Sequence, residues 1–505
     1  MNTLSMRCIS AVLCLFLLTT LHAKVRLPAL ISDNMVLQQK SKVALWGWAE
    51  RGEKVTITGS WNNKSITTTT GTNGKWQASI STTAAGGPYQ LTFKGSNILN
   101  VQNVLLGEVW LASGQSNMEF FVSKTRNASY TGVINYEQEI KAANFPMIRQ
   151  IDVANKNADE PQEDFRGDWK VCSPQTVDTF SAVAYYFARK VHQETGYPIG
   201  IINSTWGGTA AESWTKKEVL LADTGLRRLI ERYDQQVADY PAASEKHKSA
   251  LANWSADTTR TKPVAPAKPN PDKSPYRLYN AMIAPLVPYT LKGILWYQGE
   301  SNATRAQQYQ KLFPALINSW RYDFKNKNLP FYFVQISPHR SQNPEIREAQ
   351  LLTYRNTPNT GIVVTTDNGD SLDIHPRNKK PVGERLSLWA LNKLYGKKGE
   401  YSGPLYRSMK VSGDKIIIEF DHAQGLNSPQ GLKEFMIAGA DKHFVLATAV
   451  IERDKVVVSA AGVTQPVAVR YAWRNIPVAD LFNGSGLPAS PFRTDQWKSQ
   501  TPGNP

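Results

Sequence analysis

A serine at the end of an apolar run is the residue of this chain best placed for nucleophilic chemistry. Residues 109–112 (VWLA) lead into residues 114–118 (GQSNM), so Ser116 lies where a predicted strand gives way to a loop. A serine hydroxyl is a weak nucleophile until a base removes its proton and donors receive the charge of the intermediate. The alternative is a turn serine that bonds its own backbone. The glycine elbow of α/β-hydrolases is absent, because Met118 stands at its second glycine position.

One histidine has the surroundings of a general base. His375 follows a predicted strand and lies near three carboxylates, those of Asp367, Asp370 and Asp373. An imidazole that a carboxylate orients can take the proton of a serine hydroxyl. A calcium-binding loop is a competing interpretation of the three aspartates, although their spacing differs from that of an EF-hand loop.

Two other segments offer hydrogen-bond donors for an oxyanion. Gly207 and Gly208 follow a predicted strand, and paired glycines let a backbone N–H group approach a ligand closely. Asn302 ends the segment 296–302 (WYQGESN) and carries an amide N–H₂ group of the kind used to stabilise oxyanions. A tight turn without a ligand is the alternative for the two glycines.

The elements around these residues predict how they meet. Between residues 103 and 400, buried strands alternate with amphipathic helices, which predicts a parallel sheet covered on both faces. Sites in such sheets lie at the carboxyl ends of the strands, where we expect Ser116, Gly207, Asn302 and His375 to converge. The predicted strands span 104–112, 199–203, 291–296, 329–336 and 361–366, and the predicted helices span 182–195, 308–320, 345–354 and 382–395.

The flanking regions have a different pattern. Residues 24–102 show period-two alternation broken by turn signals, which predicts an N-terminal β-sandwich. Residues 401–505 are β-rich again, either as a second β-domain or as strands that complete the first. The segment at about 216–274 is polar and helical, then rich in proline, and we interpret it as an insertion on the central domain.

The N-terminal segment, the length of the chain and its apolar runs indicate where the protein acts and whether it enters a membrane. Residues 1–23 have the charged, apolar and small-residue regions of a signal peptide, so we expect an exported protein, periplasmic or secreted. About 480 mature residues exceed a single core, and no later run approaches the 20 or so apolar residues that cross a bilayer. We therefore expect several domains and no membrane insertion.

The charge pattern and the cysteine content argue against nucleic-acid binding, disulfides and a cysteine-based metal site. The formal net charge of +16 favours anionic partners, but no basic block carries interleaved aromatic residues, so we expect no nucleic acid. An acidic sugar or an anionic cell surface suits the charge. Cys172 is the only cysteine after the signal peptide, which rules out an intramolecular disulfide and a cysteine-based metal site. We expect Cys172 to be a buried, unreactive thiol.

Together these segments resemble the SGNH hydrolase superfamily, and within it the sialate O-acetylesterase-like family. The resemblance covers most of the mature chain, because segments 35–38 and 46–49 of the N-terminal region and the helix that begins near 182 also match. The matching blocks are 107–120 around the serine, 206–214 with the glycines, 278–286 with 296–303, and 373–379 around the histidine.

The resemblance implies a fold and a mechanism. The fold is an α/β, flavodoxin-like three-layer domain with a parallel sheet, flanked by β-sandwich-type regions. Ser116 attacks an acetyl ester and His375 takes its proton. The Ser116 N–H, the N–H of Gly207 or Gly208, and the Asn302 amide hold the oxyanion, and no metal or other cofactor takes part.

The aspartate is where this chain departs from the family pattern. The family places it three residues before the histidine, and Leu372 stands there instead. Asp373 is our first choice to orient His375 and Asp370 the second, while a serine–histidine dyad oriented by a backbone carbonyl is the third arrangement.

The resulting hypothesis is an exported carbohydrate O-acetylesterase that acts on O-acetylated sialic acids. Acetylated xylan or another polysaccharide is the alternative substrate, and a non-catalytic glycan-binding protein is the alternative of another class. Candidates for substrate binding are Gln115, Trp206, Gln298 and Glu300. Trp206 and Trp214 either pack in the core or line a sugar site.

Overall fold

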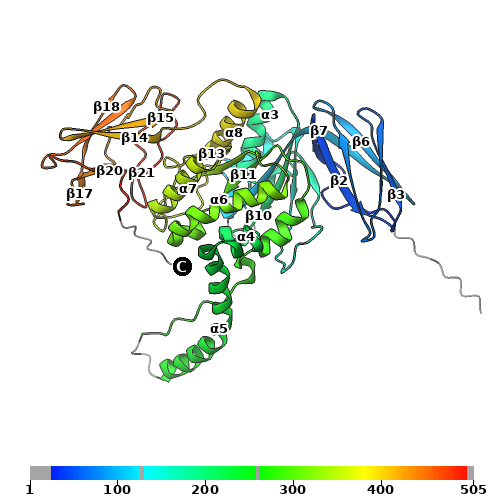
Figure 1. The fold of residues 1–505 in the computed structure, drawn as a ribbon, viewed down its shortest axis with the longest axis horizontal. Helices are drawn as coiled ribbons and strands as arrows, with labels where there is room; N and C mark the ends of the chain where they lie inside the picture. The colour runs from blue at the N-terminus through cyan, green and yellow to red at the C-terminus, as the bar shows by residue number, and fades with distance from the viewer. Residues whose placement is uncertain (1–23, 125–129, 257–258, 260, 498–505) are drawn as a thin grey trace, which may run out of the picture.

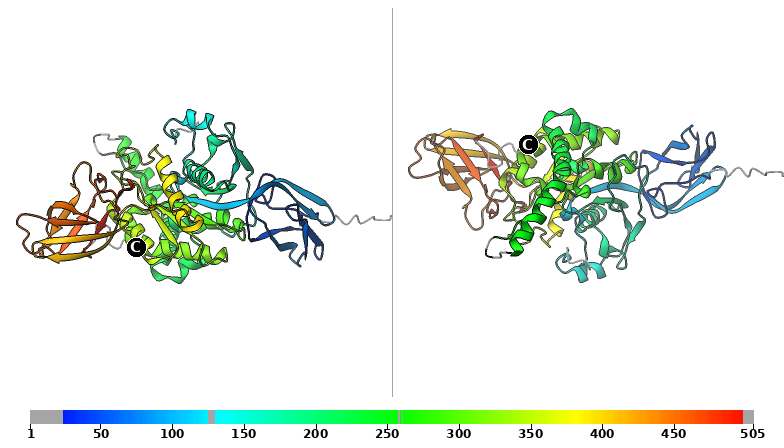
Figure 2. Two further views of the ribbon diagram at one scale, coloured as in Figure 1. Left: turned by 90° about the horizontal axis from the view of Figure 1, so that it is seen from above. Right: turned by 90° about the horizontal axis from the view of Figure 1, so that it is seen from below.

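The molecule consists of three bodies in a row and one projecting arm (Figure 1). The computed structural model describes residues 24–124, 130–256, 259 and 261–497, so the predicted signal peptide lies outside the described residues. A β-domain lies at each end, and an α/β domain lies between them. Views from above and below show the same order (Figure 2). The predicted α/β fold with flanking β-regions is confirmed.

The central domain is built on one sheet with the strand order β13-β12-β11-β7-β10-β8-β9. All neighbours in it are parallel except β9, which pairs antiparallel with β8. The strands are β7 (Ile98–Gly114), β8 (Phe145–Asp152), β9 (Trp169–Cys172), β10 (Ile199–Thr205), β11 (Gly293–Tyr297), β12 (Phe331–Val334) and β13 (Thr360–Val363).

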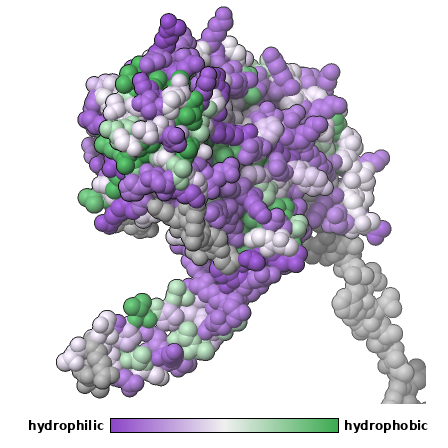
Figure 3. Space-filling view, turned by 60° about the vertical axis from the view of Figure 1, so that its left-hand side comes forward, coloured by the Kyte–Doolittle hydropathy of each residue, from purple (hydrophilic) through white to green (hydrophobic). Residues whose placement is uncertain are grey.

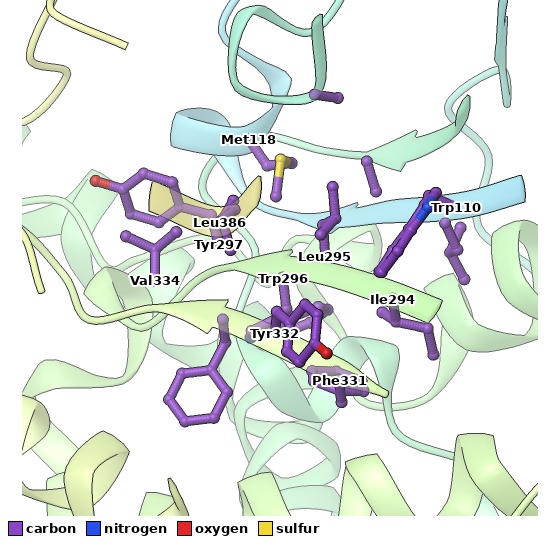
Figure 4. Packing of buried hydrophobic residues seen from close by; sticks show 14 of the residues in the cluster. Trp110, Met118, Ile294, Leu295, Trp296, Tyr297, Phe331, Tyr332, Val334 and Leu386 are labelled. Atoms are coloured by element: carbon purple, nitrogen blue, oxygen red, sulfur yellow. The ribbon is translucent and has the colours of Figure 1, made fainter. Parts of the chain in front are cut away.

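Helices cover both faces of this sheet. Successive aromatic side chains along a strand point to opposite faces and pack against the helix on each side. On β12, Phe331 and Phe333 contact Phe313 of α6, whereas Tyr332 between them contacts Trp389 of α8. Figure 4 shows Phe331 and Tyr332 of β12 among the buried side chains of β11, including Ile294 and Trp296. The covering helices are α3 (Ala182–Thr195) and α8 (Lys380–Tyr395) on one face, and α6 (Ala306–Asp323) and α7 (Pro344–Asn356) on the other.

Short helical segments follow several strands. They are α1 (Ser116–Glu119), α2 (Tyr136–Lys141) and α4 (Lys217–Ala222), the 3₁₀ segments Val177–Thr179, Ala211–Trp214, Pro271–Lys273, Ala284–Leu286 and Glu300–Arg305, and the π segment Tyr279–Ile283.

The N-terminal β-domain shares a strand with the central domain. The first half of β7 pairs antiparallel with β6, and its second half pairs with β10 and β11. The predicted division between residues 102 and 103 thus lies inside a continuous strand. The other strands of this domain are β1 (Val36–Gln38), β2 (Lys42–Trp48), β3 (Lys54–Gly59), β4 (Lys64–Thr69), β5 (Lys75–Ser81) and β6 (Gly86–Lys94).

The C-terminal strands form a β-domain of their own at the opposite end of the molecule (Figure 1). They make two four-stranded sheets, one with the order β14-β15-β19-β18 and one with the order β17-β16-β20-β21. Their bounds are β14 (Leu405–Ser412), β15 (Lys415–Asp421), β16 (Phe435–Ala438), β17 (Phe444–Leu446), β18 (Thr448–Glu452), β19 (Lys455–Ser459), β20 (Ala468–Tyr471) and β21 (Phe492–Arg493).

The arm is the helix α5 (Thr224–Ala256), which lies in the predicted insertion. Its far half stands away from the body of the protein (Figure 3). Its near half packs against α4 and α6. Within the ranges that the structure describes, no helix combines the length and apolar character needed to cross a bilayer.

Candidate active site

Three neighbouring strands of the central sheet end at the same level. The register pairs Gly114 of β7 with Thr205 of β10 and with Tyr297 of β11. The segments that follow these strands therefore lie at one edge of the sheet, where parallel α/β folds place their sites. A cavity of about 640 Å³ opens there, and Ser116, Gly207, Gly208 and His375 all line it.

A tight turn presents the serine to this cavity. Gly114 has φ +132°, and a Cβ atom at this position would lie 2.2 Å from the carbonyl oxygen of Tyr297, so only glycine fits. The backbone N–H groups of Met118 and Glu119 then donate to the carbonyl of Gln115. Ser116 is thereby held at the first residue of α1, with its side chain at the cavity wall.

The histidine is within hydrogen-bond distance of the serine. Nε2 of His375 lies 2.8 Å from Oγ of Ser116. Burial and the nearby Lys379 ammonium lower the pKa of His375, while Asp373 acts in the opposite direction. The lowered pKa favours the neutral imidazole, which is the form that can accept a proton from the hydroxyl. The ring of Tyr130 packs edge-on against it.

The aspartates near the histidine have three different partners. Oδ1 of Asp373 accepts the backbone N–H of His375 at 2.8 Å and lies 3.7 Å from its ring Nδ1, too far for a hydrogen bond. Asp370 accepts the N–H groups of Leu372 and Asp373, and these bonds lower the pKa of its carboxyl. Asp367 pairs with Arg385 on α8. Of the three, only Asp373 approaches the imidazole, through the backbone and through its charge.

The backbone N–H groups in the cavity are not equivalent. Those of Ser116 and Gly208 donate to no acceptor within the described part of the chain. The carboxyl of Glu119 accepts from the hydroxyl of Tyr130 at 2.7 Å, and the neighbouring N–H of Gly207 acts to lower the pKa of this carboxyl. Burial raises the pKa of Glu119 despite these bonds. Ser116 and Gly208 therefore have the N–H groups that remain available to an oxyanion.

The structure does not bring Asn302 or Gln298 to the cavity, contrary to expectation. The Asn302 amide donates to Glu212 at 2.8 Å, and its oxygen accepts from Ala211 and from Gln298. Glu212 is fully buried, and a buried carboxylate needs such donors. Gln298 is wholly buried as well and donates to the carbonyl of Thr209. Both side chains brace the glycine segment from inside instead of facing a ligand.

The other candidates for substrate binding do reach the cavity. Gln115, Trp206 and Glu300 line it, with Phe121 and Ser301 beside them. Trp214 is a core residue, and its indole N–H donates to Thr209. The sequence did not decide whether these two tryptophans line a sugar site or pack in the core. In the structure, Trp206 lines the cavity and Trp214 packs in the core.

A buried network that the sequence did not reveal lies beneath the serine and histidine. Lys379 is fully buried, and burial lowers the pKa of its ammonium to about 7. Its Nζ donates to the Asn117 side chain, which in turn donates to Glu300 at 2.6 Å and to the carbonyl of Ile374 at 3.0 Å. Asn117 follows the serine, and Ile374 precedes the histidine, so these bonds tie the two segments together.

Metal ligands are not gathered anywhere in the described ranges: no group of three or more histidine, cysteine, aspartate or glutamate side chains could hold an ion. Cys172 is buried, and burial raises the pKa of its thiol to about 12. A thiol of this kind is poorly reactive, in agreement with the expectation for it.

A known family of esterases matches the central domain and the segments that form the cavity. The family model described as carbohydrate esterase, sialic acid-specific acetylesterase, matches residues 106–254 and 249–391. These matches contain the serine, glycine and histidine segments and most of the central domain. The chain belongs to this family of carbohydrate esterases.

Relatives agree over nearly the whole chain. A sialate O-acetylesterase from Rattus norvegicus is 30% identical over 92% of this chain and 94% of that protein, and one from Homo sapiens is 29% identical over 92% of each. A carbohydrate acetylesterase from Xanthomonas citri has a crystal structure that matches with a TM-score of 0.80 and 35% identity, over 94% of this chain and 100% of that one. The protein is, accordingly, a carbohydrate acetylesterase.

Proposed function

We propose that the protein is a sialate O-acetylesterase that works through Ser116 and His375. The observation that carries the mechanism is the 2.8 Å approach of His375 Nε2 to Ser116 Oγ in an open cavity. The names of the rat and human relatives support the substrate. The basic net charge of the chain agrees with an acidic sugar.

In the proposed reaction, His375 takes the hydroxyl proton while Ser116 Oγ forms a bond to the carbonyl carbon of the acetyl ester. The N–H groups of Ser116 and Gly208 receive the charge that develops on the carbonyl oxygen. The ester C–O bond then breaks, and His375 returns the proton to the leaving sugar hydroxyl. Water, deprotonated by the same imidazole, hydrolyses the acetyl-enzyme to acetate.

We further propose that Asp373 orients His375 and that the protein acts after export. Asp373 supports His375 through the bond to its backbone N–H and through a carboxylate charge that favours the imidazolium. The signal-like residues 1–23 support export. Fractionation of cells that express the full chain tests this, with periplasmic or secreted protein that begins after Ala23 as the expected result.

The substrate is tested by acetate release from O-acetylated sialic acid and from acetylated xylan at equal ester concentration. We expect a higher kcat/KM with the sialic acid, and a preference for xylan would reject the proposed substrate. The nucleophile is tested with Ser116→Ala on p-nitrophenyl acetate, for which we expect a loss of about 10⁴-fold or more in kcat. Hydrolysis that persists in this variant would reject the serine mechanism.

A further inference from the structure

A second cavity adjoins the catalytic one on the side of the arm. It measures about 570 Å³, and Gly208 and Ser301 line both cavities. Helix α5 contributes Arg232 and Tyr233 to its wall, and the end of the insertion contributes Lys273. We refer to the space lined by Arg232, Tyr233, Lys273, Glu212, Arg305 and the two shared residues as the cationic cavity.

Positive charge exceeds negative charge in the cationic cavity. Arg232, Lys273 and Arg305 line it, together with a single carboxylate, Glu212. Arg305 lies 2.8 Å from this carboxylate, and Arg232 lies 3.9 Å from it. Burial works to raise the pKa of Glu212, but Arg305 and the Asn302 amide outweigh it and hold the pKa below its ordinary value. Glu212 thus pairs with both arginines, more closely with Arg305, and one carboxylate faces three cations.

Two cations of the cationic cavity lie on the side open to solvent. Lys273 is exposed and has no carboxylate partner among the described residues, and the side chain of Arg232 is 40% exposed. A Cβ atom at Gly208 would lie 3.0 Å from Nζ of Lys273, so this ammonium is adjacent to a residue of the catalytic cavity. An anionic group bound here would lie close to an ester held at Ser116.

We propose that the cationic cavity binds the carboxylate of an acidic sugar whose acetyl ester occupies the catalytic cavity. This proposal rests on the proposed function and extends it to the means of substrate selection. Lys273 and Arg232 form charge-assisted hydrogen bonds with the carboxylate. The ring of Tyr233 and the adjoining apolar wall contact the sugar. The insertion acquires a role in this way, because it provides each of these three side chains.

The test measures product binding, so it does not depend on turnover of a particular acetyl sugar. Free sialic acid and its methyl ester are each titrated as inhibitors of p-nitrophenyl acetate hydrolysis by the full chain. We expect the free acid to inhibit the wild type with a Ki at least about tenfold below that of the methyl ester, which lacks the charge. Each Ki is taken relative to the same enzyme's own uninhibited rate.

Variants then assign the effect to the cavity. We expect Arg232→Gln and Lys273→Met each to raise the Ki of the free acid about fivefold to tenfold and to change that of the methyl ester less than twofold. Arg228→Gln, on an exposed residue of the same helix outside the cavity, is the matched control and should change neither.

Two results would overturn the cationic cavity as a carboxylate site. One is equal inhibition of the wild type by the free acid and the methyl ester, which requires no variant to fold. The other is an equal rise of both Ki values in the variants, as expected if these cations only hold the arm in place. Preference for acetylated xylan over acetylated sialic acid would instead reject the proposed substrate, and the two failures are therefore distinguishable.

Discussion

The two edges of the central sheet, both reached by β7, hold buried polar groups that are used in opposite ways. At the carboxyl edge, Ser116 follows the strand and faces His375 across an open cavity. At the amino edge, Glu108 lies within the same strand, 2% exposed, and both of its oxygens are occupied. Gln38 and Gln39 donate to it from the N-terminal domain. Two groups of the central domain, the hydroxyl of Tyr395 and the ammonium of Lys292, approach it at 3.2 Å and 3.4 Å.

This difference separates groups that hold the fold from groups that do chemistry. Glu108 accepts from Gln38, Gln39 and Tyr395 and pairs with Lys292, and these partners join two domains. The N–H groups of Ser116 and Gly208 have no acceptor in the part of the chain that the structure describes, and the imidazole nitrogen Nε2 faces the serine hydroxyl. Donors that line an open cavity without a protein acceptor can bond a substrate there, whereas the donors around Glu108 are already used within the fold.

The largest expected effect is on catalysis at the carboxyl edge. His375→Ala removes the proposed general base, and we expect kcat for p-nitrophenyl acetate to fall about 10⁴-fold or more with little change in melting temperature. His339→Ala is the control, because the ring of His339 bonds Ser341 and lies outside the catalytic cavity. A loss below a hundredfold in His375→Ala, or equal losses in both variants, would contradict the assignment.

At the amino edge, a substitution should lower stability and leave kcat nearly unchanged. Glu108→Ala leaves its buried donors without an acceptor, and we expect the free energy of unfolding to fall by about 3 kcal/mol. The kcat of the folded enzyme should stay within twofold of the wild type, because Glu108 is remote from the catalytic cavity. Urea unfolding and steady-state kinetics measure the two quantities.

Glu419→Ala is the control, since it removes an acid whose ion pair with Lys455 is exposed. A fall in kcat of Glu108→Ala without loss of stability would contradict the assignment of Glu108 to the fold alone.

Sequence predicted the carboxyl edge better than the amino edge, for a physical reason. Period-two and period-3.6 patterns report which face of an element is buried, so the sheet and helices of the central domain could be read directly. Parallel strands end at one edge, which is why Ser116, Gly207 and His375 could be predicted to meet. Glu108 shows no such signal, because its partners lie up to 287 positions away in the sequence.

The errors at the site arose from side-chain direction, which spacing does not determine. Asn302 is in a segment that follows a strand at the correct edge, but its amide turns inward to Glu212. Lys379 and Asn117 are in the recognised segments, yet only the folded chain shows that they contact each other. Tyr130 had no signal at all, since its segment carries no motif.

A smaller effect should distinguish the aspartates of the histidine segment. Asp373→Asn removes the charge that favours the imidazolium and weakens the bond to the His375 N–H, so we expect kcat to fall about tenfold. Asp370→Asn alters a turn that does not contact the imidazole, and we expect less than a threefold loss. Equal activity of both variants with the wild type would favour a serine–histidine dyad.

The smallest predicted effect is a shift in the pH profile through Lys379. The reaction needs neutral His375, so kcat/KM should rise with pH through the pKa of this imidazole in the free enzyme. Burial and Lys379 lower that pKa, and the acidic limb should therefore lie below the ordinary histidine value of about 6.5.

Lys379→Met removes the larger of the two charges that lower the pKa of His375, the smaller being that of His339. The pKa of His375 should then rise, and the acidic limb of kcat/KM should move to higher pH by up to about one unit. Lys380→Met changes the exposed neighbouring lysine, which pairs with Glu384, and should leave the limb in place. A limb that stays fixed or moves to lower pH in Lys379→Met would show that the buried ammonium acts only through the Asn117 bond. In that case burial would lower the pKa of His375 without a contribution from the buried Lys379 charge.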